Sequence, residues 1–95
     1  SGGENVASRE VELALLEEDE VADVAVIGVP SERWGETVVA VVVPRTDARP
    51  DPDALREACR ARLASFKLPR LIEFVPSLPR NVSGQVLKRE LRPSV

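Results

Sequence analysis

The sequence predicts an α+β domain in which a small three-stranded sheet carries flanking helices, in the order αββαβα. Two runs rich in β-branched residues, 24–29 and 37–43, stand on either side of a short loop, and a third short run covers 71–75. Stretches with helical spacing of apolar residues precede and follow the first two runs. At 95 residues the chain has room for one such core but not for two.

The first helix is expected over residues 8–18. Val11, Ala14 and Leu15 recur there at helical spacing among acidic residues. The acidic run 17–20 then ends the helix. This helix should lay its apolar stripe on the sheet.

The strands at 24–29 and 37–43 are separated by the segment PSERWGE, whose proline and glycine indicate a loop. The second of these strands is apolar along its whole length, which is typical of a strand buried on both faces. Pro69 precedes the third strand, expected over 71–75.

A second helix is expected to begin at Asp51-Pro52, because this pair places a capping carboxylate before a proline at the first helical position. Arg56 and Arg60 then face water or a partner, with Arg62 as a further candidate, and the helix packs on the sheet. After the PSLPRNVSGQ loop, VLKRELR can add a last helical turn or two. The apolar stripe of the second helix consists of Leu55, Ala58, Cys59 and Leu63.

The composition excludes several kinds of site. The chain has no histidine and one cysteine, Cys59, so it offers no internal disulfide, no zinc site and no Ser/His or Cys/His nucleophile. Cys59 falls on the apolar helix face and is interpreted as a small buried residue. No Gly-rich phosphate loop is present. With no apolar run of membrane-spanning length and no signal-peptide pattern, a cytoplasmic location without a membrane span is the expectation.

The net charge of −3 conceals two unlike halves. Residues 1–55 carry 4 basic and 13 acidic groups, whereas residues 56–95 carry 9 basic and 3 acidic groups, which gives −9 and +6. The basic half suggests attraction for a polyanion such as nucleotide phosphates. The alternative is a solvated surface on which the charges of the two halves balance.

Three collinear segments carry a resemblance to a known family: SGGENVASREVE, VIGVPSERWGETVVAVVVPR and SFKLPRLIEFVPSLPRNVSGQVLKREL. Together they cover most of the chain, and they resemble the C-terminal domain of acyl-CoA synthetases, in the acyl-adenylate-forming superfamily. The resemblance implies that residues 1–95 form a mobile lid that rotates over a larger N-terminal domain, absent here, between a pose for acyl-AMP formation and a pose for thioester formation. It places Ser1 at or just past the hinge.

The resemblance also assigns candidate residues to coenzyme A. The opening Gly2-Gly3-Glu4-Asn5 resembles the loop that enters the active site in the second step, and Trp34 resembles an aromatic residue along the pantetheine path. A terminal loop and a core anchor are the respective alternatives. Phe66 matches an aromatic position that contacts the CoA adenine, with packing against the sheet as the alternative. Arg60 and Lys67, with Arg62 as a further candidate, are close enough in sequence to supply charge for CoA phosphates.

The segment PRNVSGQVLKREL resembles the family motif in which the catalytic lysine of adenylation directly follows the glycine. Here Gln85 follows Gly84. That lysine contacts the acyl carboxylate and the ATP α-phosphate, so an uncharged glutamine at this position is expected to cost about 3 to 4 kcal/mol of transition-state stabilisation. Gln85 is either an engineered substitution, an acetyl-lysine mimic included, or a natural departure. Lys88, three residues on, is not expected to replace the lysine.

The resemblance therefore implies a parent that converts a carboxylic acid, ATP and CoA into acyl-CoA, AMP and pyrophosphate, with Mg²⁺ used by the parent and not bound by this domain. The chain by itself is expected to be inactive. Its expected partners are the N-terminal domain of the same enzyme and CoA, with no nucleic acid. Two alternatives stay open: an adenylation domain that loads a carrier protein, and a non-catalytic interaction domain.

Overall fold

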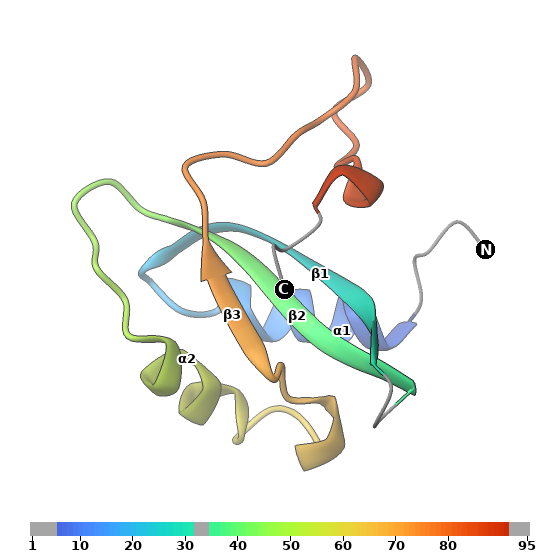
Figure 1. Ribbon diagram of the computed structural model, residues 1–95. Coiled ribbons are helices and arrows are strands. Elements are labelled where there is room, and N and C mark those ends of the chain that lie inside the picture. The colour runs from blue at the N-terminus through green and yellow to red at the C-terminus, as the bar shows by residue number, and fades with distance from the viewer. Residues whose placement is uncertain (1–5, 32–34, 92–95) are drawn as a thin grey trace.

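The computed structural model describes residues 6–31 and 35–91, which form the expected α+β domain (Figure 1). Two α-helices and a three-stranded sheet are followed by an irregular C-terminal segment that contains a short 3₁₀ turn. The described elements are α1 (Val6–Leu16), β1 (Val21–Ser31), β2 (Gly35–Pro44), α2 (Pro52–Cys59), the 3₁₀ turn η1 (Ser65–Lys67), β3 (Leu71–Phe74) and the 3₁₀ turn η2 (Lys88–Glu90).

The sheet is mixed, with the order β1-β2-β3. Strands β1 and β2 form an antiparallel hairpin in which Val24 faces Val42, whereas β2 and β3 run parallel, with Val39 opposite Leu71. The parallel pairing requires a crossover, and the segment containing α2 supplies it. The pairing register of β1 shifts between Val21 and Asp23.

The central strand β2 is buried on both faces, as its apolar sequence predicts. Val39, Ala40, Val41 and Val42 are each at most 3% exposed. One face of the sheet packs against α1, α2 and the turn that follows α2. The other face is covered by the segment after β3, through Leu78 and its neighbours. Both sheet faces are thus used for packing, and the covering segment 75–91 includes the loop with Gln85.

The start of α2 agrees with the prediction, whereas its end comes earlier than the predicted apolar stripe. The side chain of Asp51 accepts a hydrogen bond from the backbone N–H of Asp53 at 3.3 Å, and Pro52 occupies the first turn. Leu55 and Cys59 are buried, and Leu63, which lies beyond the end of the helix, is 8% exposed. The helix ends at Cys59, and the chain that follows it still packs Leu63 on the sheet.

Strands β1 and β2 are longer than the predicted runs 24–29 and 37–43, whereas β3 ends at Phe74, one residue before the predicted end. Pairing of β1 and β2 continues to Ser31 opposite Gly35, well into the expected loop. Pro30 is tolerated there because β1 is an edge strand and a proline at an edge need not donate to the ladder. The first helix covers Val6–Leu16, two residues earlier than predicted at each end.

Candidate functional site

The Gln85 loop, residues 80–86, is closed by its own hydrogen bonds. Arg80 and Val86 form an isolated antiparallel bridge at its base, and the backbone N–H of Asn81 donates to the Gln85 carbonyl at 3.0 Å. The Asn81 side-chain oxygen accepts from the backbone N–H and the hydroxyl of Ser83 and from the backbone N–H of Gln85, each at 3.0 Å. This Asx-type turn fixes the backbone before any partner binds.

Gly84 takes a left-handed conformation at the tip of this loop, with φ of 88°. A Cβ built on it would meet no atom within 4 Å, so the glycine is required by its backbone angle and not by lack of space. The sharp turn at Gly84 presents the next residue, Gln85, whose side chain is exposed.

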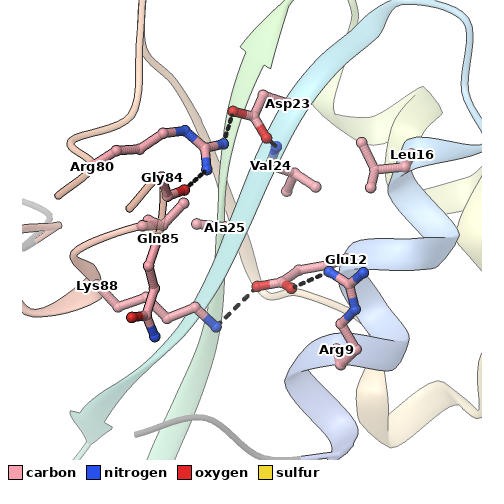
Figure 2. Close-up of a pocket in the computed structure, with 11 residues that line it drawn as sticks. Arg9, Glu12, Leu16, Asp23, Val24, Ala25, Arg80, Gly84, Gln85 and Lys88 are labelled. Atoms are coloured by element: carbon pink, nitrogen blue, oxygen red, sulfur yellow. Dashed lines mark hydrogen bonds and ion pairs between the residues drawn. The ribbon is translucent and has the colours of Figure 1, made fainter. Parts of the chain in front are cut away.

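Gln85 lies on the rim of a cavity of about 400 Å³ between α1, β1 and the loop (Figure 2). The cavity wall carries charged groups of both signs, which are joined in pairs: Arg80 with Asp23, and Lys88 with Glu12. The amide of Gln85 can donate and accept hydrogen bonds but supplies no charge.

The side chain of Lys88 is directed into the domain, where it pairs with Glu12. Its Nζ lies 2.9 Å from Oε2 of Glu12, and its side chain is only 17% exposed. The ammonium points into the domain, toward α1, and away from the exposed loop tip (Figure 2). That Lys88 does not replace the lysine stays a prediction, which this pairing with Glu12 supports.

A second group of candidate residues lies around η1. Phe66 is 81% exposed, so the alternative that it packs against the sheet is wrong. Lys67 Nζ lies 5.7 Å from the centre of the Phe66 ring, in a cation–π arrangement, and 2.7 Å from Oε1 of Glu10 on α1. Arg60 pairs with Glu57 at 2.7 Å, and both side chains are more than half exposed.

The structure keeps these two groups of residues apart. The turn η1 precedes β3, near the point where Arg70 N–H donates to the Val38 carbonyl. The Gln85 loop follows β3 and is tied to Asp23, which is paired with Val43 near the other end of the sheet. In Figure 1 η1 and the loop accordingly lie at opposite ends of β3. The structure thus offers one exposed loop and one exposed aromatic–basic surface, and does not combine them into one site.

Arg56, which was expected to face water or a partner, instead contacts the backbone of the same domain. Its Nε donates to the Pro69 carbonyl at 2.9 Å and its Nη2 to the Arg70 carbonyl at 3.2 Å, so it joins α2 to the start of β3.

Cys59 is fully buried, and burial raises the pKa of its thiol above the ordinary value, with Arg62 opposing and Glu18 adding to the shift. Cys59 is therefore a packing residue.

Two further observations concern residues 6–31 and 35–91. No helix there has the length and apolar character that a membrane crossing requires. Nor does that part of the chain gather three His, Cys, Asp or Glu side chains in a way that could hold a metal ion.

Comparison with known proteins decides the family. The model of the AMP-binding enzyme C-terminal domain matches residues 10–85, which is most of the chain and ends at Gln85. The chain belongs to the AMP-binding enzyme C-terminal domain family. This is the family of domains to which the three collinear segments point.

The relatives of this AMP-binding C-terminal domain are whole ligases. It is 48% identical over 92 residues to 2-succinylbenzoate–CoA ligase of Geobacillus kaustophilus, with 97% of this chain and 19% of the relative covered. It is 49% identical over 90 residues to the fatty acid–[acyl-carrier-protein] ligase ScoC of Streptomyces coeruleorubidus, covering 95% of this chain and 17% of that protein. The chain therefore spans about a fifth of the length of these relatives.

A solved structure gives the same result for the fold of the domain. The amide bond synthetase McbA of Marinactinospora thermotolerans superposes with a TM-score of 0.85 at 42% sequence identity, over 90% of this chain and 17% of that one. The names of these three proteins refer to CoA, to an acyl-carrier protein and to an amide bond, respectively. The family of the C-terminal domain does not by itself select among them.

Four of the candidate residues, Gly2, Gly3, Glu4 and Trp34, lie outside the described part of this AMP-binding C-terminal domain. Conversely, sequence reasoning did not single out Glu12, Asp23 or Arg80, which hold the Gln85 loop. A signal was present for Glu12: it lies between Val11 and Leu15 on the apolar stripe of α1, where a carboxylate needs a partner. Nothing local in the sequence pairs Asp23 with Arg80, which are 57 residues apart.

Proposed function

We propose that this domain is the mobile lid of an ATP-dependent acyl-CoA synthetase, which joins a carboxylic acid to CoA through an acyl-adenylate. The observation that carries the proposal is the Gln85 loop. An exposed side chain stands there on a backbone fixed by Asn81 and Gly84, at the position where the resemblance places the adenylation lysine. A fixed loop suits a group that must meet a transition state without reorganising.

In this proposal position 85 acts in the first half-reaction. As the carboxylate oxygen attacks the α-phosphorus, negative charge develops on the phosphate oxygens, and a lysine would neutralise it. Gln85 offers an N–H donor without charge. A charge-assisted hydrogen bond is roughly twice as strong as a neutral one, so the parent with Gln85 should adenylate its acid slowly, by a factor of about 10² to 10³.

The second half-reaction involves the opposite end of β3. Phe66 presents an exposed ring on which an adenine can stack, and Lys67 and Arg60 carry charge suited to phosphates. Because Lys67 is paired with Glu10 and Arg60 with Glu57, CoA phosphates would compete with these carboxylates. The affinity of this surface for CoA should therefore be weak and sensitive to salt.

The separation of the two groups fits a rotating lid. If the Gln85 loop enters the active site for adenylation, a rotation of the whole domain withdraws it and brings another part of the domain to the same place. The Gly2–Asn5 segment is the proposed part that then lies beside pantetheine. A rigid domain with different functional residues at different places on its surface suits such an exchange.

A second candidate function is the loading of a carrier protein, favoured by the 49% identity to the ligase ScoC. Both functions share acyl-AMP formation and differ in the acceptor. The test is to supply the full-length ligase with an acid, ATP and one acceptor at a time: CoA, a phosphopantetheinylated carrier protein or an amine. Product analysis by mass spectrometry is expected to give the CoA thioester as the fastest product.

A faster carrier-protein thioester or amide would overturn the CoA assignment but keep the ligase. To separate slow chemistry from absent chemistry, the assay is repeated with the Gln85→Lys variant. If neither version makes acyl-AMP from any acid in a broad panel, the non-catalytic alternative is correct and the proposal fails. The 95-residue chain alone serves as the blank, since it is expected to give no pyrophosphate exchange.

A further inference from the structure

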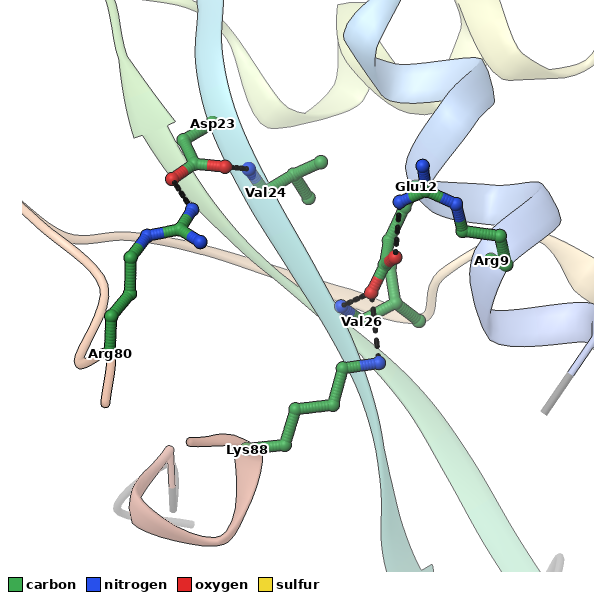
Figure 3. Close-up of polar contacts among 7 residues, drawn as sticks. All are labelled: Arg9, Glu12, Asp23, Val24, Val26, Arg80 and Lys88. Carbon is green, nitrogen blue, oxygen red and sulfur yellow. Dashed lines mark hydrogen bonds and ion pairs between the residues drawn. The ribbon is translucent and has the colours of Figure 1, made fainter. Parts of the chain in front are cut away.

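The Gln85 loop is fastened to the rest of the domain by two cations that flank Gln85 in the sequence (Figure 3). Arg80, five residues before it, pairs with Asp23 of β1, and Lys88, three residues after it, pairs with Glu12 of α1. The loop's own hydrogen bonds fix its shape but do not fix its place on the domain. Two ion pairs tie it to β1 and α1, in addition to the packing of Val86 against the sheet.

The first anchor reaches the peptide bond that precedes Gln85. Arg80 donates from Nη1 to the Gly84 carbonyl at 2.7 Å and from Nη2 to Asp23 Oδ2. The N–H of the same peptide, that of Gln85, donates to the Asn81 side chain. Both polar atoms of the Gly84–Gln85 peptide are therefore held, and one of the holding groups is itself fixed to β1.

The carboxylate of Asp23 is held in place by the backbone of β1. Asp23 lies at the register shift of β1, and its second carboxylate oxygen accepts from the backbone N–H of Val24 at 2.9 Å. The carboxylate is thereby oriented before Arg80 reaches it. The pair is partly exposed, with side-chain exposures of 41% for Arg80 and 36% for Asp23.

The second anchor is buried. Glu12 is the one charged residue among the buried side chains of the described part of the chain, at 5% exposure. Its Oε2 accepts from the backbone N–H of Val26 at 2.9 Å and lies 2.9 Å from Lys88 Nζ, while Oε1 lies 3.5 Å from Arg9. Separating Lys88 from this buried carboxylate would leave a buried charge without its partner, which is strongly unfavourable.

We propose that Asp23 and Glu12 are positioning residues for position 85, which lock the loop to β1 and α1 so that it moves only with the domain as a whole. The effect of these residues on adenylation rests on the function proposed above, but their attachment of the loop to the domain does not. Residue 85 is then placed by rotation of the domain and not by closure of a separate loop. Misplacement of a catalytic group by about 1 Å can cost up to about 10²-fold in rate, so the lock matters for chemistry.

The locking is tested on the chain itself by amide hydrogen exchange and ¹⁵N relaxation of residues 81–86. Asp23→Asn removes the charge but keeps an oxygen for Val24, and it is expected to raise exchange at Gln85 about two- to fivefold, the range for a partly exposed ion pair. Asp23→Glu, which keeps the charge, should restore most of the protection. Asp53→Asn is the matched control, because it breaks an ion pair with Arg56 and makes no contact with the loop.

Glu12→Gln is expected to loosen the loop more than Asp23→Asn, because its pair is buried. If Glu12→Gln fails to fold, Asp23→Asn alone decides, since its carboxylate is partly exposed. Unchanged exchange at residues 81–86 in Asp23→Asn, or equal change in Asp53→Asn, would overturn the proposal.

The positioning role is tested in the full-length ligase carrying Gln85→Lys. Adding Asp23→Asn should lower kcat for acyl-AMP formation about two- to tenfold, with KM for ATP and the rate of thioester formation from supplied acyl-AMP unchanged. Equal losses in both half-reactions would refute positioning. If the Gln85→Lys ligase gives no adenylation, the proposed function fails. The hydrogen exchange of residues 81–86 still tests whether the two ion pairs hold the loop on the domain.

Discussion

Phe66 and Val82 are both large apolar side chains left in solvent, at 81% and 109% exposure, yet only Phe66 has a cation beside it. Neither contributes packing that a substitution could remove. We therefore expect Phe66→Ala to leave the melting temperature unchanged. Because base stacking on an aromatic ring is worth about 1–3 kcal/mol, the same change should weaken CoA binding by at least about fivefold.

Titration of CoA into the chain, followed by amide shifts of residues 60–70, measures this effect. Val82→Ala is the matched control, equally exposed but located on the Gln85 loop, and it should bind CoA as the unsubstituted chain does. CoA shifts that cluster on α1, or equal loss in both variants, would remove Phe66 from the CoA surface.

Cys59, unlike Phe66 and Val82, is buried, and we expect burial to suppress the reactivity of its thiol. The raised pKa of its thiol keeps it protonated in the folded domain, so labelling by iodoacetamide should be at least about a thousandfold slower than in urea. The unfolded chain loses this proton above about pH 8.5. Since the folded chain then binds more protons, stability should fall as pH rises above that value. Labelling at equal rates in the folded and unfolded states would contradict the assignment.

Sequence reasoning succeeded at those residues whose role depends on local pattern. The cap at Asp51 and the burial of Cys59 follow from helical spacing and a neighbouring proline, and both are confirmed. Of the two carboxylates that hold the Gln85 loop, Glu12 has a local signal, its place on the apolar stripe of α1, whereas Asp23 has none. Asp23 meets Arg80 only because β1 and the C-terminal segment meet in the folded domain.

Among the elements, α2 and β3 are joined by Arg56, which donates to two carbonyls at the turn before β3. Pro69, one of the two acceptors, is among the most deeply buried residues. Removal of Arg56 would leave this carbonyl without its donor, which costs about 1–3 kcal/mol. We expect Arg56→Ala to lower the free energy of unfolding in urea by about 1–2 kcal/mol.

Arg60→Ala is the matched control for this prediction. Arg60 also lies at the α2 end but pairs only with the exposed Glu57, so its loss should cost less than about 0.5 kcal/mol. Equal destabilisation by both substitutions would show that Arg56 contributes through charge and not through its carbonyl contacts.

The elements themselves were largely predictable, because periodicity and turn residues are local signals. The two α-helices, the three strands and their order are confirmed. The last expected helix is only the 3₁₀ turn Lys88–Glu90, and the 3₁₀ turn Ser65–Lys67 was not predicted. What the pattern could not give is the pairing. The parallel alignment of β3 with β2, and the register that places Val39 beside Leu71, depend on how α2 crosses the sheet.

At the scale of the whole molecule, the two unlike halves of the chain neutralise each other. Among the described residues five ion pairs join the acidic half to the basic half: Glu18 with Arg62, Glu10 with Lys67, Asp23 with Arg80, Glu12 with Lys88, and the neighbours Asp53 and Arg56. The basic half is therefore less available to polyanions than its sequence suggests. Attraction for CoA, where it occurs, has to come from local residues and not from the net charge of the half.

The central claim is that the domain carries position 85 to the active site for adenylation and away from it for thioester formation. The most direct measurement compares both half-reactions in the full-length ligase with Gln85 and in its Gln85→Lys variant. Lysine is expected to raise the rate of acyl-AMP formation by about 10² to 10³. With preformed acyl-AMP and CoA, the two proteins should form thioester at nearly equal rates. A similar gain in both half-reactions, or none in either, would contradict the account.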